Sequence, residues 1–167
     1  MEISVRYIKG EPAFDSLEVI KLVCDRSVDI NDRIFGQTQL GRNDDLLFAK
    51  ILSFESEPDA SSSVMLELSS GENTVCSKIF FDGRSELSVN GISANDKLSA
   101  YIISGEDLQG EYWGAVIMLP LSLIFEHFSL SEQQLPCAVY GNIHRCSSFT
   151  SSASLNGSAK IILNSKK

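Results

Sequence analysis

The sequence predicts an all-β fold: an antiparallel β-sandwich of about nine to eleven strands with one short helix. Short apolar or alternating segments recur about every ten residues, and Gly, Asn, Asp and Ser separate them. Only one segment has the three- and four-residue apolar spacing of a helix. No internal repeat or linker is visible, so we expect residues 1–167 to form one sandwich domain around one core.

The first half of the chain is a series of expected strands joined by polar turns. Segment 46–54 is apolar on both sides, which indicates a strand covered on both faces. Segment 64–68 alternates instead, with Val64, Leu66 and Leu68 on one side, as in a half-buried strand. We expect strands at 2–8, which alternates like an edge or entry strand, and at 19–24, 35–41, 46–54, 64–68, 74–81 and 85–89.

Turn chemistry separates these strands. Asp82-Gly83 and Asn90-Gly91 are strong signals for tight hairpins, because Asn, Asp and Gly accept the positive φ angles of such turns. Residues 43–45, Asn-Asp-Asp, also predict a turn. The polar stretches 25–32 and 55–63 are expected to be loops, the second of them on the surface.

The most informative stretch is 112–128, which holds the single Trp of the chain. Residues 112–119 are all apolar or Gly, which predicts a central strand that buries Trp113 in the core. Pro120 ends the strand and is suited to the start of a helix. One face of a two-turn helix is then formed by Leu121, Ile124, Phe125 and Phe128.

The rest of the second half again favours strands, at 98–104, 137–144 and 159–163. Residues 147–158 are rich in Ser, Thr, Asn and Gly, and we expect a long mobile loop there. The residues after 163 are expected to form a frayed tail.

Composition narrows the function classes. The net charge of −8 argues against nucleic acid or an anionic membrane as the main partner, because both require a basic surface. No apolar run reaches the roughly 18 to 20 residues of a membrane span, and residues 1–8 resemble a strand more than a signal peptide. We therefore expect a cytoplasmic protein. Its cysteines are then expected to be reduced and mostly buried: Cys24, Cys76, Cys137 and Cys146.

Catalytic and metal-binding motifs are absent from the sequence. There is no G-x-S-x-G, H-E-x-x-H or phosphate-binding loop, and the cysteine spacing does not suggest zinc. The histidines are His127, expected on the exposed side of the helix, and His144. We expect no enzyme activity, no cofactor and no metal site.

Four pieces of the sequence resemble the carbohydrate-binding family 9-like modules, which belong to the DOMON-like β-sandwich group. They are the strand pair spanning 37–58, the strand 64–68, the Tyr-Trp-Gly segment with its Leu-Pro-Leu-Ser-Leu end at 112–123, and Tyr-Gly-Asn-Ile-His-Arg at 140–145. The resemblance implies a sandwich fold and a non-catalytic role in sugar binding. Two features depart from the family pattern: Ser61-Ser62-Ser63 replaces an acidic residue, and the chain has only one Trp.

A sugar site requires an aromatic face and planar hydrogen-bonding groups. The strand around Tyr140 offers both, because alternation places Tyr140, Asn142 and His144 on one face. A solvent-facing polar strand would show the same pattern. The candidate ligand-binding residues are Tyr140, Asn142, His144, Arg145 and Tyr112, with Tyr112 and Tyr101 expected on neighbouring strands.

Three functional hypotheses follow. The first is a non-catalytic module that binds a saccharide or another small polar ligand. The second is a sandwich that has lost sugar binding and serves as a protein-interaction or scaffolding domain, because aromatic residues make up only 8% of the chain. The third, an enzyme, depends on a cleft near His144 and Arg145.

Overall fold

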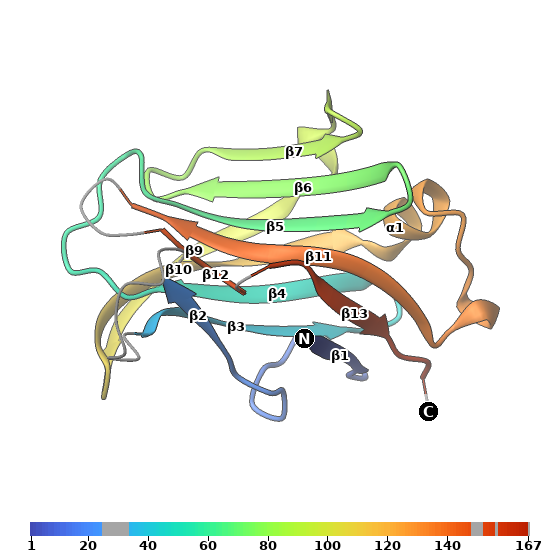
Figure 1. The fold of residues 1–167 in the computed structure, drawn as a ribbon, viewed down its shortest axis with the longest axis horizontal. Helices are drawn as coiled ribbons and strands as arrows, with labels where there is room; N and C mark the ends of the chain where they lie inside the picture. Colours follow the sequence, from blue (N-terminus) through green and yellow to red (C-terminus); the bar gives the residue numbers. More distant parts are fainter. Residues whose placement is uncertain (25–33, 148–151, 156, 167) are drawn as a thin grey trace.

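A two-layered β-sandwich is formed by the residues that the computed structural model describes, 1–24, 34–147, 152–155 and 157–166 (Figure 1). The front layer in Figure 1 contains β7 (Ser85–Val89), β6 (Asn73–Phe80), β5 (Ser63–Ser70), β11 (Cys137–Cys146) and β13 (Ala159–Leu163). The back layer contains β3 (Ile34–Arg42), β4 (Leu46–Ser53), β10 (Gly110–Pro120) and β9 (Ser99–Asp107). The all-β prediction is confirmed.

Hydrogen bonds join the two layers along one side into a single thirteen-stranded sheet, counted over the described residues. β1 (Glu2–Tyr7) pairs in parallel with β13 and with β3, so it connects front to back. A second connection runs from β11 through β12 (Ala153–Ser154) and β2 (Ile20–Cys24) to β3. The three strand pairs of this connection are antiparallel. Of the two alternatives for β1, an edge or an entry strand, the edge is excluded because β1 is paired on both sides; among the described strands the edges are β8 (Ile92–Ser93) and β9.

β10 is the centre of the back layer and confirms the expected buried strand. It pairs with β4 on one side and with β9 on the other. Trp113 is only 1% exposed and packs edge to face against Phe81, with the ring centroids 5.3 Å apart. The large aromatic side chain thus belongs to the core and not to a surface platform.

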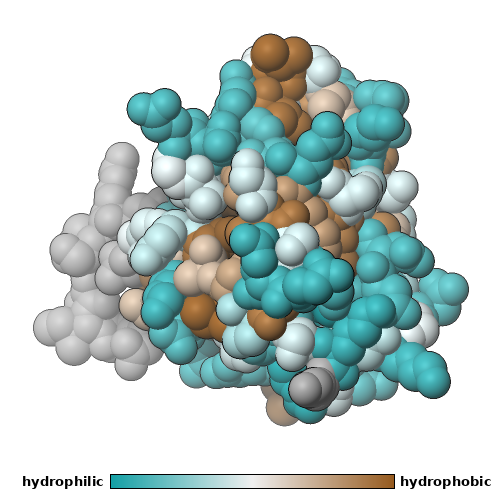
Figure 2. Space-filling view, turned by 90° about the vertical axis from the view of Figure 1, so that its right-hand side faces the viewer, coloured by the Kyte–Doolittle hydropathy of each residue, from teal (hydrophilic) through white to brown (hydrophobic). Residues whose placement is uncertain are grey.

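The single α-helix of the described residues, α1 (Leu121–His127), closes one end of the sandwich. Pro120 is the last paired residue of β10 and lies opposite Leu46, so the helix begins directly after the strand. Leu121 and Ile124 are buried as predicted. Figure 2 views this end of the molecule, where hydrophobic residues gather between hydrophilic ones. Two short 3₁₀ turns, Asn95–Lys97 and Glu132–Gln134, complete the helical segments.

A covering segment protects the outer face of the back layer. Residues 8–19 connect β1 to β2, and within them Phe14 packs edge to face on Phe48 with the ring centroids 5.4 Å apart. Gln39 donates its side-chain amide to the carbonyl oxygens of Phe14 (2.8 Å) and Leu17 (3.0 Å). This cover explains how β4 is buried on both faces.

Both predicted hairpins are present. Asn90 and Gly91, with φ angles of 51° and 78°, form the two-residue turn between β7 and β8. Gly83, with φ of 94°, lies in the turn between β6 and β7. The prediction for 25–32 lies outside the described residues.

Three local predictions were wrong. Residues 153 and 154, expected within a mobile loop, form β12 because they pair with both β11 and β2. Glu55 and Ser62, expected in a surface loop, are buried. His127, expected on the exposed side of α1, is half-buried, because its ring lies 5.6 Å from that of Phe128.

Cys76, Cys137 and Cys146 form no disulfide and are half-buried, so they are less buried than expected. Among the described residues, no helix has the length and apolar character needed to cross a membrane.

The close approach of β10 and β4 gives a test of the fold. A Cβ atom at position 114 would overlap the carbonyl oxygen of Ile51, which cannot move without breaking the strand pair. We expect Gly114→Ala to lower the free energy of unfolding by about 1–3 kcal/mol, measured by urea denaturation.

Gly105→Ala in the neighbouring strand β9 is the matched control. Its nearest neighbour would be the Tyr112 hydroxyl at 2.6 Å, at the far end of a side chain that can turn away. Equal losses for the two substitutions would contradict the backbone-contact explanation.

Candidate functional site

The outer face of the front layer carries three of the predicted site residues. Tyr140, Asn142 and His144 alternate along β11 with buried Gly141 and Ile143, so they share the face that points away from the core. Tyr140 is 49% exposed, whereas Asn142 and His144 are half-buried. The alternation argument therefore placed these three side chains correctly.

Strand pairing extends this face across β5 and β6. Asn142 lies opposite Glu67, which in turn lies opposite Cys76. Tyr140 lies opposite Ser69, which is paired with Thr74. Directly opposed residues of antiparallel strands point to the same face, so these polar side chains form one continuous surface.

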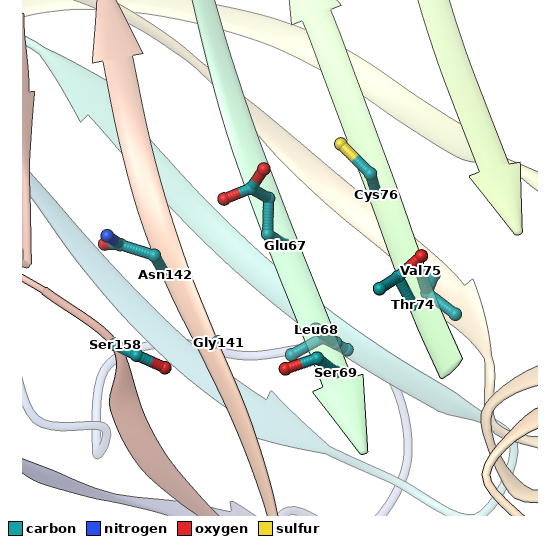
Figure 3. A pocket seen from close by; sticks show the side chains of 9 residues that line it. All are labelled: Glu67, Leu68, Ser69, Thr74, Val75, Cys76, Gly141, Asn142 and Ser158. Atoms are coloured by element: carbon teal, nitrogen blue, oxygen red, sulfur yellow. The ribbon is translucent and has the colours of Figure 1, made fainter. Parts of the chain in front are cut away.

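A hollow of about 410 Å³ lies on this surface (Figure 3). We call it the outer hollow. Side chains from β5, β6 and β11 and from the segment before β13 surround it, and in Figure 3 Glu67 and Asn142 stand on adjacent strands. The outer hollow is lined by Glu67, Leu68, Ser69, Thr74, Val75, Cys76, Gly141, Asn142 and Ser158.

Hydrogen bonds hold the two planar polar groups of the outer hollow in position. His144 Nε2 lies 2.8 Å from Glu67 Oε2, so the ring N–H donates to the carboxylate. Asn142 Oδ1 accepts hydrogen bonds from the backbone N–H groups of Leu155 (3.1 Å) and Ile143 (2.8 Å). Both side chains are thus oriented before a ligand arrives, which lowers the entropic cost of binding.

The Cys76 thiol stays neutral near pH 7. Burial, and next the negative charge of Glu67, raise the pKa of Cys76 above its usual value. Because the thiolate is the reactive form, this cysteine offers the hollow a small, weakly polar wall and not a nucleophile.

Arg145 does not join this face. It follows His144 in β11, so its side chain points inward, where it is completely buried. Its Nε donates to the carbonyl oxygen of Phe35 at 3.1 Å, and the guanidinium lies over the Phe35 ring at 5.2 Å from the centroid. Arg145 therefore contacts β3 of the back layer instead of a ligand on the outer surface.

The tyrosines expected nearby are also elsewhere. Tyr112 and Tyr101 belong to β10 and β9 of the back layer, which do not neighbour β11. Tyr112 packs edge to face against Phe54 at a centroid distance of 6.3 Å. The structure thus brings Tyr140, Asn142 and His144 together and separates Arg145 and Tyr112 from them.

Sequence reasoning missed the β5 and β6 side of the outer hollow. The alternation of segment 64–68 already indicates that Glu67 faces away from the core. What the pattern does not contain is the pairing of β5 with β11, which joins residues about seventy positions apart, such as Tyr140 and Ser69. Glu67, Ser69 and Cys76 were therefore absent from the predicted site.

Over the described residues, no group of three or more His, Cys, Asp or Glu side chains is placed to hold a metal ion. The chemistry available at the outer hollow is accordingly hydrogen bonding by one carboxylate, one amide and several hydroxyls.

Comparison with solved structures identifies the fold as that of carbohydrate-binding modules. A Bacteroides uniformis protein, described as a candidate carbohydrate-binding protein, superposes with a TM-score of 0.68 at 15% identity, over 98% of this chain and 99% of that one. A family 9 carbohydrate-binding module from Caldicellulosiruptor kristjanssonii, solved with glucose, superposes with a TM-score of 0.60 at 11% identity, over 100% and 98%. The expected family 9-like fold is confirmed. No protein-family model and no curated protein matches the sequence.

The contrast between Arg145 and His144 can be measured. We expect Arg145→Ala to lower the free energy of unfolding by about 2–4 kcal/mol, because it empties a buried site and removes the hydrogen bond to Phe35. His144→Ala, on the exposed side of the same strand, should cost no more than about 1 kcal/mol. Chemical denaturation of both variants checks this. An Arg145→Ala protein as stable as the wild type would refute the stabilising role of the buried Arg145.

Proposed function

We propose that the protein is a non-catalytic binding module whose outer hollow receives a saccharide or another small polar ligand. The observation that carries this proposal is the hollow of about 410 Å³ on the three-stranded outer surface, whose apolar walls carry a few placed polar groups. Its size is within the range of about 300–1,000 Å³ typical of small-molecule sites. The similarity of the fold to carbohydrate-binding modules, one of them solved with glucose, supports the same ligand class.

The chemistry of the lining suits a ligand rich in hydroxyl groups. The Glu67 carboxylate can accept hydrogen bonds from two vicinal hydroxyls, and the Asn142 amide can donate to them. Ser69, Thr74 and Ser158 add hydroxyls that both donate and accept. At the margin, the half-exposed ring of Tyr140 offers an apolar face for the C–H side of a sugar ring.

Binding without catalysis is supported by the number of acidic groups. Glycoside hydrolysis generally requires two carboxylates across the scissile bond. Among the described residues that line the outer hollow, Glu67 is the single carboxylate, and its hydrogen bond from His144 holds it. The neutral Cys76 thiol provides no second reactive group.

We retain the cytoplasm as the proposed location. The unpaired Cys76, Cys137 and Cys146 agree with a reducing compartment.

Calorimetric titration with glucose and with gluco- and xylo-oligosaccharides tests the sugar site. We expect binding to at least one of these sugars. Glu67→Gln and Asn142→Ala should each weaken this binding about tenfold, because each alters or removes a hydrogen bond between the sugar and the carboxylate or the amide. Glu126→Gln, on the exposed surface of α1, is the matched control and should bind like the wild type. Absence of heat at millimolar sugar would remove the proposal.

The second candidate function is protein interaction, and the edge strand β9 favours it. Tyr101 and Ile102 on β9 and Leu108 in the following turn are exposed apolar side chains beside an unpaired strand edge. Co-purification of a protein partner that is lost on Tyr101→Ser, together with no response to any sugar, would favour this alternative.

A further inference from the structure

A second hollow, of about 480 Å³, lies at the end of the sandwich opposite α1. We call it the end hollow. The segment after β4, the residue after β6 and the β9–β10 hairpin surround it. Glu55, Pro58, Phe81, Glu106, Glu111 and Trp113 are the lining residues that matter here. None of them lines the outer hollow.

Glu55 carries a buried oxygen with no partner. The residue is only 8% exposed, and its Oε1 accepts hydrogen bonds from Trp113 Nε1 (2.6 Å) and Ser53 Oγ (3.3 Å). Its Oε2 is buried and has no hydrogen-bond partner within the described part of the chain. An unsatisfied carboxylate oxygen in such a place is costly, so a donor is expected to occupy the position facing it.

Two further carboxylates lie at the same hollow. Glu106 and Glu111 are directly opposite each other in the β9–β10 pair, and both are exposed. Like charges in this position repel each other and destabilise the strand pair. Among the described residues that line the end hollow, there is no Lys, Arg or His to neutralise these carboxylates.

The remaining walls combine aromatic and apolar residues with Ser56 and Ser104. Trp113 and Phe81 meet edge to face, with an interplanar angle of 72°, and Pro58 is beside them. Aromatic rings next to carboxylates attract organic cations, whose charge is spread over an apolar body. A metal ion fits less well, because the described residues contain no group of three or more ligating side chains placed to hold one.

We propose that the end hollow binds a protonated amine, with its ammonium group donating to Glu55 Oε2 and its apolar part against Phe81 and Pro58. Glu106 and Glu111 attract the cation at the rim, and its charge relieves their repulsion. The amine can come from a free small molecule, such as an amino sugar, or from a lysine side chain of a partner protein. This site is separate from the proposed sugar site and does not depend on it.

Fluorescence of Trp113, the single Trp of the chain, reports binding directly. Titration with n-butylamine should change its emission saturably, whereas 1-butanol, of similar shape but uncharged, should not. Glucosamine and N-acetyl-lysine methylamide are the next two probes, and the tighter one identifies the source of the amine. Because Glu55→Gln exchanges the unpaired acceptor for an amide donor while keeping an acceptor for Trp113, we expect it to weaken n-butylamine binding about tenfold or more.

Two further variants serve as controls, one against misfolding and one against binding at the outer hollow. Glu106→Gln combined with Glu111→Gln alters only exposed side chains, so the protein should fold, and it should weaken n-butylamine binding severalfold at low salt. Glu67→Gln, in the outer hollow, should leave amine binding unchanged, which separates this site from the sugar site. Equal responses to n-butylamine and 1-butanol, or no effect of Glu55→Gln, would overturn the proposal. It would also be overturned by no amine response at all, as expected if a buried water satisfies Oε2, or by a response to Ca²⁺ that excludes the amine.

Discussion

The burial of β4 and β10 on both faces is the constraint on which the rest of the structure depends. These two adjacent strands are too apolar to leave either face in water, so each face must be covered. The front layer covers the inner face, where Trp113, Ala115 and Ile117 contribute to the core. The outer face is covered over β4 by the 8–19 segment through Phe14 and Leu17.

This asymmetry leaves one sheet face open for the proposed polar ligand. Where the covering segment lies on the back layer, the sheet is shielded, whereas no described segment covers the outer face of β5, β6 and β11 in this way. Its side chains are accordingly polar, and the strand pairing holds Glu67 and Asn142 opposite each other on a surface with little freedom to move. The back layer therefore needs a covering segment on its outer face, whereas the front layer keeps a rigid polar outer face.

Local patterns in the sequence predicted the strands better than the sites. Alternation along β11 is a local property, so the outward direction of Tyr140 could be predicted without knowledge of any partner strand. The burial of Glu55 could not be predicted in this way, because it depends on a hydrogen bond that its carboxylate accepts from Trp113, which is 58 positions away in the sequence. The same limit applies to Arg145, which the motif around Tyr140 grouped with surface residues although its partner, the Phe35 carbonyl, is 110 positions distant. The face to which a side chain points follows from its neighbours in sequence, but which side chains meet at a site follows from the sheet topology.

The position of β1 has a consequence for the order of folding. Glu2 is paired with Lys160, so β1 can take its place beside β13 only after the roughly 150 residues between them have been synthesised. Until then β1 can pair only with β3, to which just two of its residues are paired. Such distant pairing makes closure of the sandwich a late and slow step, during which an unpaired strand edge is open to other chains. Pairing strands so far apart in sequence therefore leaves the edge of β1 exposed to mispairing until β13 has formed.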